Sequence, residues 1–321
     1  MHPFTHIDAT SVAEAIPLLD ATSRPLAGGT DMLPLMKEGI VTPERLVNLK
    51  RTDDLRHVHI RTEDSGLLIG ALTTLAELSE NASVRSGYTA LAQAAGEAAS
   101  PQLRNMATLG GNLLQQVRCW YYRGDFQCWL KGGDICHARD GQNEYHAIFD
   151  QSPCVAVYPS DPPAALLALD ASLGIVGPQG ARSVKLADFL QPPDEARHVM
   201  HTLAPDELIV AIELPATRSR SVYLKAMDRA VWAYALASVA VAAELTDGVA
   251  RNVRIVLGGV ANVPVRATEA EALVEGRALD EPLLRQAGEV AIAGAQPLAH
   301  NRYKLPLVRN LVAQALRDIQ S

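Results

Sequence analysis

Cysteine is the residue type whose placement stands out in this chain of 321 residues. The four cysteines, Cys119, Cys128, Cys136 and Cys154, lie in one stretch, separated by eight, seven and seventeen residues. Thiolates bind zinc and iron–sulfur clusters, and pairs of thiols can also form disulfides. Four thiols so close in the sequence therefore indicate one shared site.

Three kinds of site fit such a cluster of cysteines: disulfides, a zinc centre and an iron–sulfur cluster. The N-terminal residues carry neither a charged nor an apolar signal segment, which disfavours disulfides. No Cys-x2-Cys pair occurs, so the spacing favours a metal without distinguishing zinc from iron. His137 could add a ligand, although a solvated loop histidine is the simpler interpretation. Inert buried thiols are the plain alternative.

The segment around the cysteines is predicted to be a long structured loop. It holds several aromatic residues, yet its glycines and mixed charges give neither helical nor strand periodicity. Long loops inside compact domains are uncommon unless something organises them, and a metal held by four thiolates would do so. Regular patterning resumes near Ser160, so the loop is predicted to be inserted into a folded domain.

Two glycine pairs form a second set of candidate binding residues. An Ala-Gly-Gly-Thr segment at residues 27–30 follows a predicted strand, and a Thr-Leu-Gly-Gly-Asn segment at residues 108–112 follows a predicted helix. Glycines let the backbone approach a ligand closely, and consecutive N–H groups at a helix start suit a pyrophosphate. Taken alone, each pair is more simply explained as a tight turn. The Gly-x-Gly-x-x-Gly and P-loop motifs are both absent, which disfavours a Rossmann or P-loop site.

The elements that must position these residues indicate an α+β fold with two domains. In the first domain, capping boxes at Ser11 and Glu14 and at Thr74 and Glu77 predict helix starts. The composition changes near residues 214–221, where we expect a linker, and we place the domains at residues 1–217 and 218–321. The second domain is predicted to hold a hairpin with an Asp-Gly turn, formed by strands at residues 239–245 and 253–257. Helices near residues 267–275, 282–293 and 303–318 would cover it.

Charge and hydropathy exclude several classes of function. The formal net charge is −7 and the sequence pI is about 5.7, which argues against a binder of nucleic acid or anionic membranes. The longest apolar stretch is too short to span a bilayer. We therefore expect a soluble protein that folds in the cytoplasm, or that reaches the periplasm together with a signal-bearing partner.

Taken in order, the motifs resemble those of the FAD-binding medium subunits of the xanthine dehydrogenase family of molybdenum hydroxylases. They are Ala-Gly-Gly-Thr-Asp at 27–31, Thr-Leu-Gly-Gly-Asn at 108–112, Pro-Ser-Asp at 159–161, Glu-Leu-Ile-Val at 207–210 and Tyr-x-Lys at 223–225. The resemblance covers nearly the whole chain. It implies a two-lobed PCMH-type FAD-binding domain and a smaller α+β C-terminal domain similar to that of CO dehydrogenase flavoproteins.

Residues 113–159 depart from the pattern of most family members, which pass from Gly-Gly-Asn to Ser-Asp in a few residues. This insertion resembles the subgroup whose flavoprotein subunit carries an additional 4Fe–4S cluster, including periplasmic aldehyde oxidoreductase and 4-hydroxybenzoyl-CoA reductase. The resemblance implies that all four cysteines ligate one such cluster, so iron–sulfur now outweighs zinc.

The resemblance also implies roles in binding FAD. The segment that would wrap the pyrophosphate comprises Pro25, Leu26, Ala27, Gly28, Gly29, Thr30, Asp31 and Met32, and the second flavin segment comprises Thr108, Gly111 and Asn112. Asp161 would accept a hydrogen bond from a sugar or ribityl hydroxyl, unless it merely caps the next helix. Lys225 would stabilise a reduced anionic flavin, unless it is a solvated strand lysine. Ile209 would contact the flavin or lie in the core. Neither glycine motif holds a histidine or cysteine, so FAD should be non-covalent.

The function implied is that of an electron-transfer subunit in a heterotrimeric molybdenum hydroxylase. A large partner would hold the molybdenum cofactor and act on the substrate, and a small partner would relay electrons through two 2Fe–2S clusters. This chain would pass them through FAD to a soluble external acceptor. The alternative from another class is a non-catalytic scaffold with a zinc-bound loop and glycine motifs that are mere turns.

Overall fold

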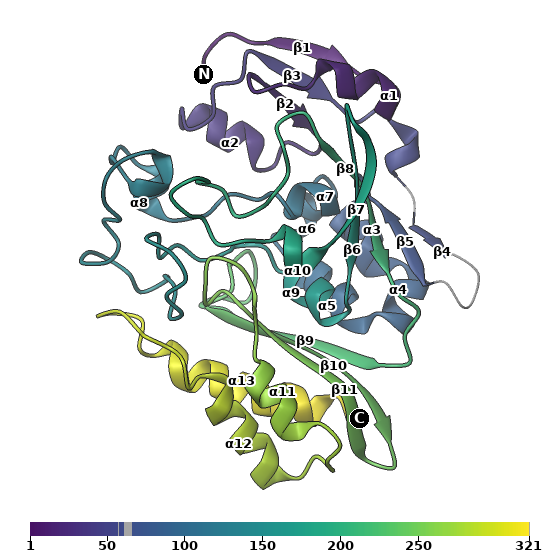
Figure 1. The fold of residues 1–321 in the computed structure, drawn as a ribbon, viewed down its shortest axis with the longest axis vertical. Coiled ribbons are helices and arrows are strands. Elements are labelled where there is room, and N and C mark those ends of the chain that lie inside the picture. Colours follow the sequence, from purple (N-terminus) through teal and green to yellow (C-terminus); the bar gives the residue numbers. More distant parts are fainter. Residues whose placement is uncertain (57, 61–65, 321) are drawn as a thin grey trace.

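A small parallel sheet forms the first lobe of the computed structural model, which describes residues 1–56, 58–60 and 66–320 (Figure 1). Its strands are β1 (Thr5–Asp8), β3 (Arg45–Asn48) and β2 (Ser23–Leu26), in that order. Helix α1 (Val12–Ala15) and the 3-10 helix η1 (Ile16–Leu18) connect β1 to β2. Helix α2 (Met32–Lys37) begins soon after the glycine turn that follows β2. The expected order of strand, glycine turn and helix is confirmed.

An antiparallel sheet forms the second lobe. Its strand order is β4 (Val58–Ile60), β5 (Leu67–Gly70), β8 (Leu208–Leu214), β6 (Ser172–Gly177) and β7 (Gly180–Lys185). Short helices accompany it: η2 (Asp53–Leu55), α3 (Leu75–Glu80), α4 (Ala82–Gly87), α5 (Thr89–Glu97), α6 (Pro101–Arg104), α7 (Leu109–Asn112), α9 (Pro162–Ala168) and α10 (Leu186–Phe189). The capping box predicted at Thr74 and Glu77 starts α3. At α1, Ser11 caps the helix, but the Glu14 carboxylate binds Thr10 instead.

A second antiparallel sheet belongs to the C-terminal part of the chain (Figure 1). Its order is β12 (Val265–Arg266), β11 (Val249–Gly258), β10 (Ala237–Thr246) and β9 (Arg220–Ala226). Helices α11 (Thr268–Val274), α12 (Glu281–Ala291) and α13 (Lys304–Asp318) cover one face. Because β9 begins at Arg220, the linker is shorter than the sequence indicated.

Strand β10 is buried on both faces, which explains its uninterrupted apolar sequence. Val239 and Val241 pack into the core beneath α11, α12 and α13. Ala240 and Ala242 point the other way, into the large core of the second lobe, which also contains residues of α5 and α9. The two cores are thus separated by one sheet.

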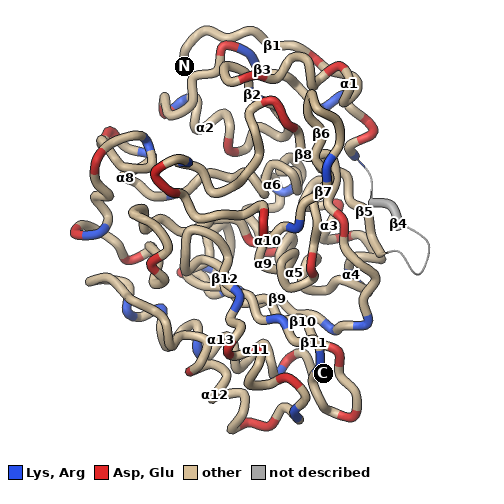
Figure 2. The backbone as a smooth tube through the Cα atoms, in the orientation of Figure 1, with Lys and Arg blue, Asp and Glu red and all other residues tan. Residues whose placement is uncertain are grey.

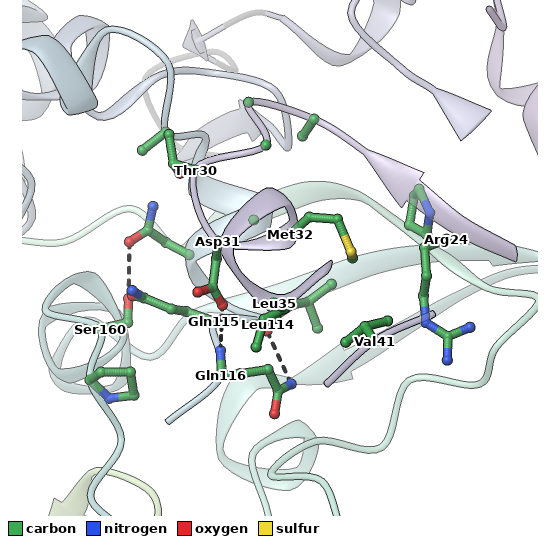
Figure 3. A pocket seen from close by; sticks show the side chains of 18 of the residues that line it. Arg24, Thr30, Asp31, Met32, Leu35, Val41, Leu114, Gln115, Gln116 and Ser160 are labelled. Carbon is green, nitrogen blue, oxygen red and sulfur yellow. Dashed lines mark hydrogen bonds between the residues drawn. The ribbon is translucent and has the colours of Figure 1, made fainter. Parts of the chain in front are cut away.

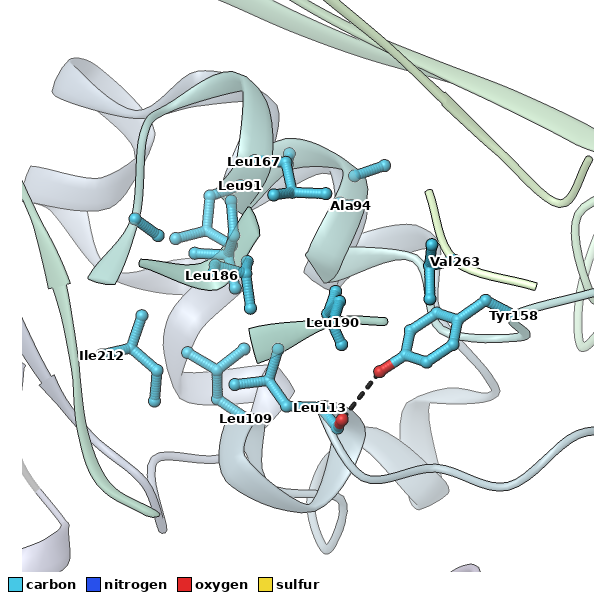
Figure 4. Close-up of a cluster of buried hydrophobic side chains, with 14 of the residues drawn as sticks. Leu91, Ala94, Leu109, Leu113, Tyr158, Leu167, Leu186, Leu190, Ile212 and Val263 are labelled. Atoms are coloured by element: carbon cyan, nitrogen blue, oxygen red, sulfur yellow. Dashed lines mark hydrogen bonds between the residues drawn. The ribbon is translucent and has the colours of Figure 1, made fainter. Parts of the chain in front are cut away.

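The insertion runs outside these layers and contains α8 (Trp120–Arg123) and the 3-10 helix η3 (Trp129–Lys131) (Figure 1). Its two ends meet in the large core, where the buried Tyr158 hydroxyl donates to the Leu113 carbonyl oxygen at 2.7 Å (Figure 4). Leu109, Leu190 and Val263 surround this contact (Figure 4). A long excursion therefore leaves and rejoins the domain at one fixed point.

Charged residues of both signs are interspersed along the backbone (Figure 2). Among the described residues, no helix has the length and apolar character needed to cross a lipid bilayer.

Candidate functional site

The first glycine turn is held open at the end of β2. A Cβ atom on Gly28 would lie 1.7 Å from the Met106 carbonyl oxygen, so no other residue type fits there. Gly29 has a φ of 74°, in the left-handed region that glycine adopts at little cost. The Lys50 ammonium donates to the Ala27 carbonyl at 3.3 Å. Within the described part of the chain, the amides of Gly28, Gly29 and Thr30 have no acceptor, so these donors are available to a ligand.

The second glycine turn is the short helix α7. The Thr108 hydroxyl accepts from the Gly111 amide at 3.2 Å and so caps the helix. The side-chain nitrogen Nδ2 of Asn112 donates to the Thr108 carbonyl at 3.0 Å. The side-chain oxygen Oδ1 of Asn112 accepts from the Ser160 hydroxyl at 3.3 Å (Figure 3). This last bond joins the turn to the Pro-Ser-Asp segment across the insertion.

Both glycine turns border one cavity of about 760 Å³, within the range of cofactor sites. The predicted residues that line it are Pro25, Ala27, Gly28, Gly29, Thr30, Asp31, Met32, Thr108, Gly111, Asn112 and Asp161. Further walls come from residues 40–44, 198–207 and 232–234. The free amides, the glycines and the size of the cavity fit a dinucleotide such as FAD.

Three predicted residues lie away from the cavity. Leu26 packs with Met36 and Leu46 in a small core of the first lobe, and Ile209 lies in the large core of the second lobe. Neither side chain lines the cavity. Lys225 is likewise absent from the cavity wall, because its side chain is fully buried behind Asp161.

Asp161 and Lys225 form a buried ion pair. The Lys225 ammonium donates to Asp161 Oδ2 at 2.8 Å and to the Glu97 carbonyl oxygen at 3.1 Å, and the Tyr223 hydroxyl donates to Asp161 Oδ1 at 2.6 Å. Burial raises the pKa of the Asp161 carboxyl, against the opposing effect of Lys225. Asp161 makes no side-chain cap to α9, so the simple capping interpretation is wrong, as is that of Lys225 as a solvated lysine.

The Asp31 carboxylate faces the insertion. Its Oδ1 atom lies 2.8 Å from Arg118 Nη2 and 2.9 Å from Arg123 Nη2. Its Oδ2 atom accepts from the backbone amide of Gln116 at 2.9 Å (Figure 3). Arg123 also pairs with Glu38 at 3.1 Å. The glycine loop and the first residues of the insertion are therefore tied together.

The four cysteines converge on a second, small cavity. Cys119, Cys128, Cys136 and Cys154 line it together with Tyr121, Tyr122, Trp129, Leu130, His137 and Ala156. All four are unpaired thiols, and those of Cys128 and Cys154 are buried. Among the described residues, no three histidine, cysteine, aspartate or glutamate side chains are close enough to hold one metal ion.

The C-terminal domain holds the cysteine segment through buried side chains. Asn262 donates to the Cys154 and Ala156 carbonyls at 2.9 and 2.8 Å. Asn301 donates to the carbonyls of His146 and Ala147 at 3.1 and 2.9 Å. The insertion thus rests on both domains.

This docking holds His146 against Cys119. Its Nε2 atom lies 3.2 Å from the Cys119 sulfur, and its Nδ1 atom is buried without a partner among the described residues. His137 lines the cavity but its ring nitrogen contacts the Gln127 carbonyl at 3.3 Å. The histidine that contacts a cysteine sulfur is therefore His146 and not His137, the histidine that the sequence places directly after a cysteine.

Two family models match the chain in succession. Residues 2–217 match the FAD binding domain in molybdopterin dehydrogenase, and residues 222–319 match the CO dehydrogenase flavoprotein C-terminal domain. The chain belongs to the FAD-binding medium subunits of the xanthine dehydrogenase and CO dehydrogenase family. The expected family, fold class and assignment as an oxidoreductase subunit are confirmed, and the scaffold alternative is not supported.

Similar proteins cover the chain from end to end. The aldehyde oxidoreductase FAD-binding subunit PaoB of Escherichia coli is 37% identical over 100% of this chain and 99% of its own length. The carbon monoxide dehydrogenase medium chain of Afipia carboxidovorans is 31% identical over 91% of this chain and 86% of its own. The structure of a carbon monoxide dehydrogenase from Hydrogenophaga pseudoflava matches with a TM-score of 0.79 at 27% identity, covering 99% of this chain and 98% of that one. This FAD-binding subunit therefore resembles its relatives over both domains.

Several residues that line the larger cavity were not predicted from the sequence. Gln116, Arg118 and Tyr122 line the larger cavity although they belong to the insertion, which was assigned to the cysteine site alone. Residues 232–234 reach the same cavity from the C-terminal domain. The available signal for Arg118 was its position directly before Cys119, whereas nothing local marks residues 232–234.

Proposed function

We propose that this FAD-binding subunit transfers electrons within a heterotrimeric molybdenum hydroxylase, between iron–sulfur clusters, its own FAD and a soluble external acceptor. The partners would be a large subunit with the molybdenum cofactor and a small subunit with 2Fe–2S clusters. The observation that carries this proposal is the convergence of four thiols on one cavity in a chain of this flavoprotein family. The relatives' names as medium chains and FAD-binding subunits support the assembly into a complex.

The cofactor-binding residues proposed for FAD are those that line the larger cavity. The free amides of the first glycine turn would donate to the pyrophosphate, and the capped second turn would hold the chain close to it. Bound FAD exchanges electrons singly or in pairs. The buried pair of Asp161 and Lys225 would fix the floor of the site, since Asp161 lines the cavity and Lys225 holds it from behind.

The metal ligands proposed are Cys119, Cys128, Cys136 and Cys154, around one 4Fe–4S cluster. Such a cluster carries single electrons, and its potential depends on burial and on hydrogen bonds to the sulfurs. His146 is placed to donate one such bond to the Cys119 sulfur. We propose residues 113–159 as the iron–sulfur insertion in an FAD domain of residues 1–217, followed by a C-terminal domain of residues 218–321.

Metal and flavin analysis of the purified complex tests this function. We expect four irons attributable to this subunit and one flavin that acid precipitation releases into the supernatant. A Cys128→Ser variant should lose the cluster's absorption, whereas Ile135→Ala, at an exposed position beside the cysteine cavity, should keep it. One zinc and no iron per chain in anaerobic protein, or flavin that stays in the acid pellet, would contradict the respective part of the proposal.

A further inference from the structure

The insertion forms part of the wall of the larger cavity. Leu114, Gln115, Gln116, Arg118 and Tyr122 line it, and the backbone amide of Gln116 donates to the Asp31 carboxylate of the glycine loop (Figure 3). These residues precede or lie between the first cysteines of the segment. One inserted segment thus borders both cavities, and Tyr122 lines the two of them.

Arg118 is the charged residue that the insertion contributes to this wall, and its side chain has unused hydrogen-bonding capacity. A guanidinium has five N–H donors. The Nη2 atom of Arg118 pairs with Asp31, and its guanidinium carbon Cζ lies 5.2 Å from the centre of the Tyr234 ring. Its Nε atom is buried and has no partner in the described part of the chain. Leaving a donor of a charged group buried and unpaired costs free energy. The Nη1 donors also have no partner in the described part of the chain, and because Arg118 lines the cavity and its side chain is 27% exposed, they are open to an anion there.

The position of Arg118 indicates which anion. Its carboxylate partner, Asp31, is the last residue of the Ala-Gly-Gly-Thr-Asp segment, whose free amides face the same cavity. Those amides are neutral donors, while a pyrophosphate carries negative charge that a guanidinium binds strongly. Asp31 and Tyr234 fix the guanidinium from two sides, so little side-chain entropy would be lost on binding.

We propose that the insertion completes the FAD site and that Arg118 binds the pyrophosphate of FAD. This inference rests on FAD binding by the chain and is independent of the metal that the cysteines hold. Asp31, which lines the same cavity, then also acts as a positioning residue that aims Arg118.

FAD titration of the flavin-depleted complex, followed by quenching of flavin fluorescence, tests the proposal. Arg118→Gln should weaken FAD binding about tenfold or more, as expected for the loss of one charge-assisted hydrogen bond. Arg118→Lys, which keeps the charge but not the fork of donors, should fall between this variant and the wild type. Arg139→Gln is the matched control, because Arg139 also lies in the insertion but pairs with Asp150 at 2.8 Å, away from the cavity.

Two results would overturn the inference. One is wild-type affinity for FAD in Arg118→Gln. The other is an equal loss of affinity in Arg139→Gln, which would trace the effect to general loosening of the insertion. A wild-type complex that binds no FAD at all would instead refute the proposed cofactor itself, so the two failures are distinguishable.

Discussion

At the scale of single residues, Gly28 has a role different from the one its motif suggests. A glycine beside a bound pyrophosphate is expected to make room for the ligand. Here the space that a side chain would need is already filled by the Met106 carbonyl oxygen, 1.7 Å from the Cβ position. The glycine therefore lets two backbone segments touch, and this contact places both glycine turns at the same cavity.

Gly28→Ala should destabilise the protein even without flavin. The added methyl group must displace backbone atoms, and overpacking of this kind costs about 1–3 kcal/mol. Urea unfolding of flavin-depleted protein measures the loss. Gly87→Ala is the control, since nothing outside its chain neighbours and its own helix backbone lies within 4 Å of its Cβ position, and the residue ends helix α4. Equal stability of the two variants would contradict this account.

Lys225→Met should be among the most destabilising substitutions in the chain. It would leave the buried Asp161 carboxylate without its cation, and breaking a buried ion pair from one side costs about 3–5 kcal/mol. Adding Asp161→Asn to the same chain removes the stranded charge and should restore part of the free energy of unfolding. Additive losses in the double variant would show that the two side chains do not act as a pair.

At the scale of elements, the docking of the insertion on helix α13 depends on a buried lysine. The Lys304 side chain is completely buried and donates to the carbonyl oxygens of Gly259 and Tyr145 at 2.9 and 3.1 Å. Its partners are neutral, and burial lowers its pKa to about 7. We therefore expect the stability of this contact to depend on pH.

The stability of the wild type relative to Lys304→Met should rise between pH 7 and about pH 10. In this window the unfolded chain keeps the Lys304 proton and the folded chain has lost it, so raising the pH favours the folded state. The expected gain is on the order of a few kcal/mol. Urea unfolding of both proteins across this range measures the difference, and a difference that does not change with pH would refute the shifted pKa.

Elements could be predicted from the sequence where their signal is local. The helices expected at residues 267–275, 282–293 and 303–318 correspond to α11, α12 and α13, because each shows an apolar face at helical spacing. The hairpin of β10 and β11 was marked by its Asp-Gly turn. The bonds from Asn301 to the insertion could not be predicted, because they join residues about half a chain apart. The same holds for Lys225, whose burial depends on how β9 packs against α5 and on its bond to Asp161.

At the scale of the whole molecule, the larger cavity lies where both lobes, the insertion and the C-terminal domain meet. Its walls come from the parallel sheet of the first lobe, from α7 and residues 198–207 of the second lobe, from the insertion and from residues 232–234 of the C-terminal domain. A ligand that fills the cavity would therefore contact both lobes, the insertion and residues 232–234 of the C-terminal domain. It should therefore stabilise the molecule as one unit.

FAD should raise the free energy of unfolding by about 2.7 kcal/mol when its free concentration is one hundred times the dissociation constant. The reason is that FAD binds the assembled walls and not the unfolded chain. Thermal unfolding at increasing FAD concentration measures the effect. At the same FAD concentrations, the unfolding midpoint of the Gly28→Ala variant should rise by less than that of the wild type. A midpoint that is independent of FAD concentration would contradict binding in this cavity.

The docking of the insertion on the C-terminal domain also has a consequence for biosynthesis. Asn262, Asn301 and Lys304, which hold the insertion, and residues 232–234 of the cavity wall are all translated after both glycine turns. A nascent chain that has emerged only as far as residue 217 therefore has its glycine turns but not a finished cavity. Flavin loading should follow release from the ribosome, and ribosome-bound chains stalled before Lys304 should not retain FAD.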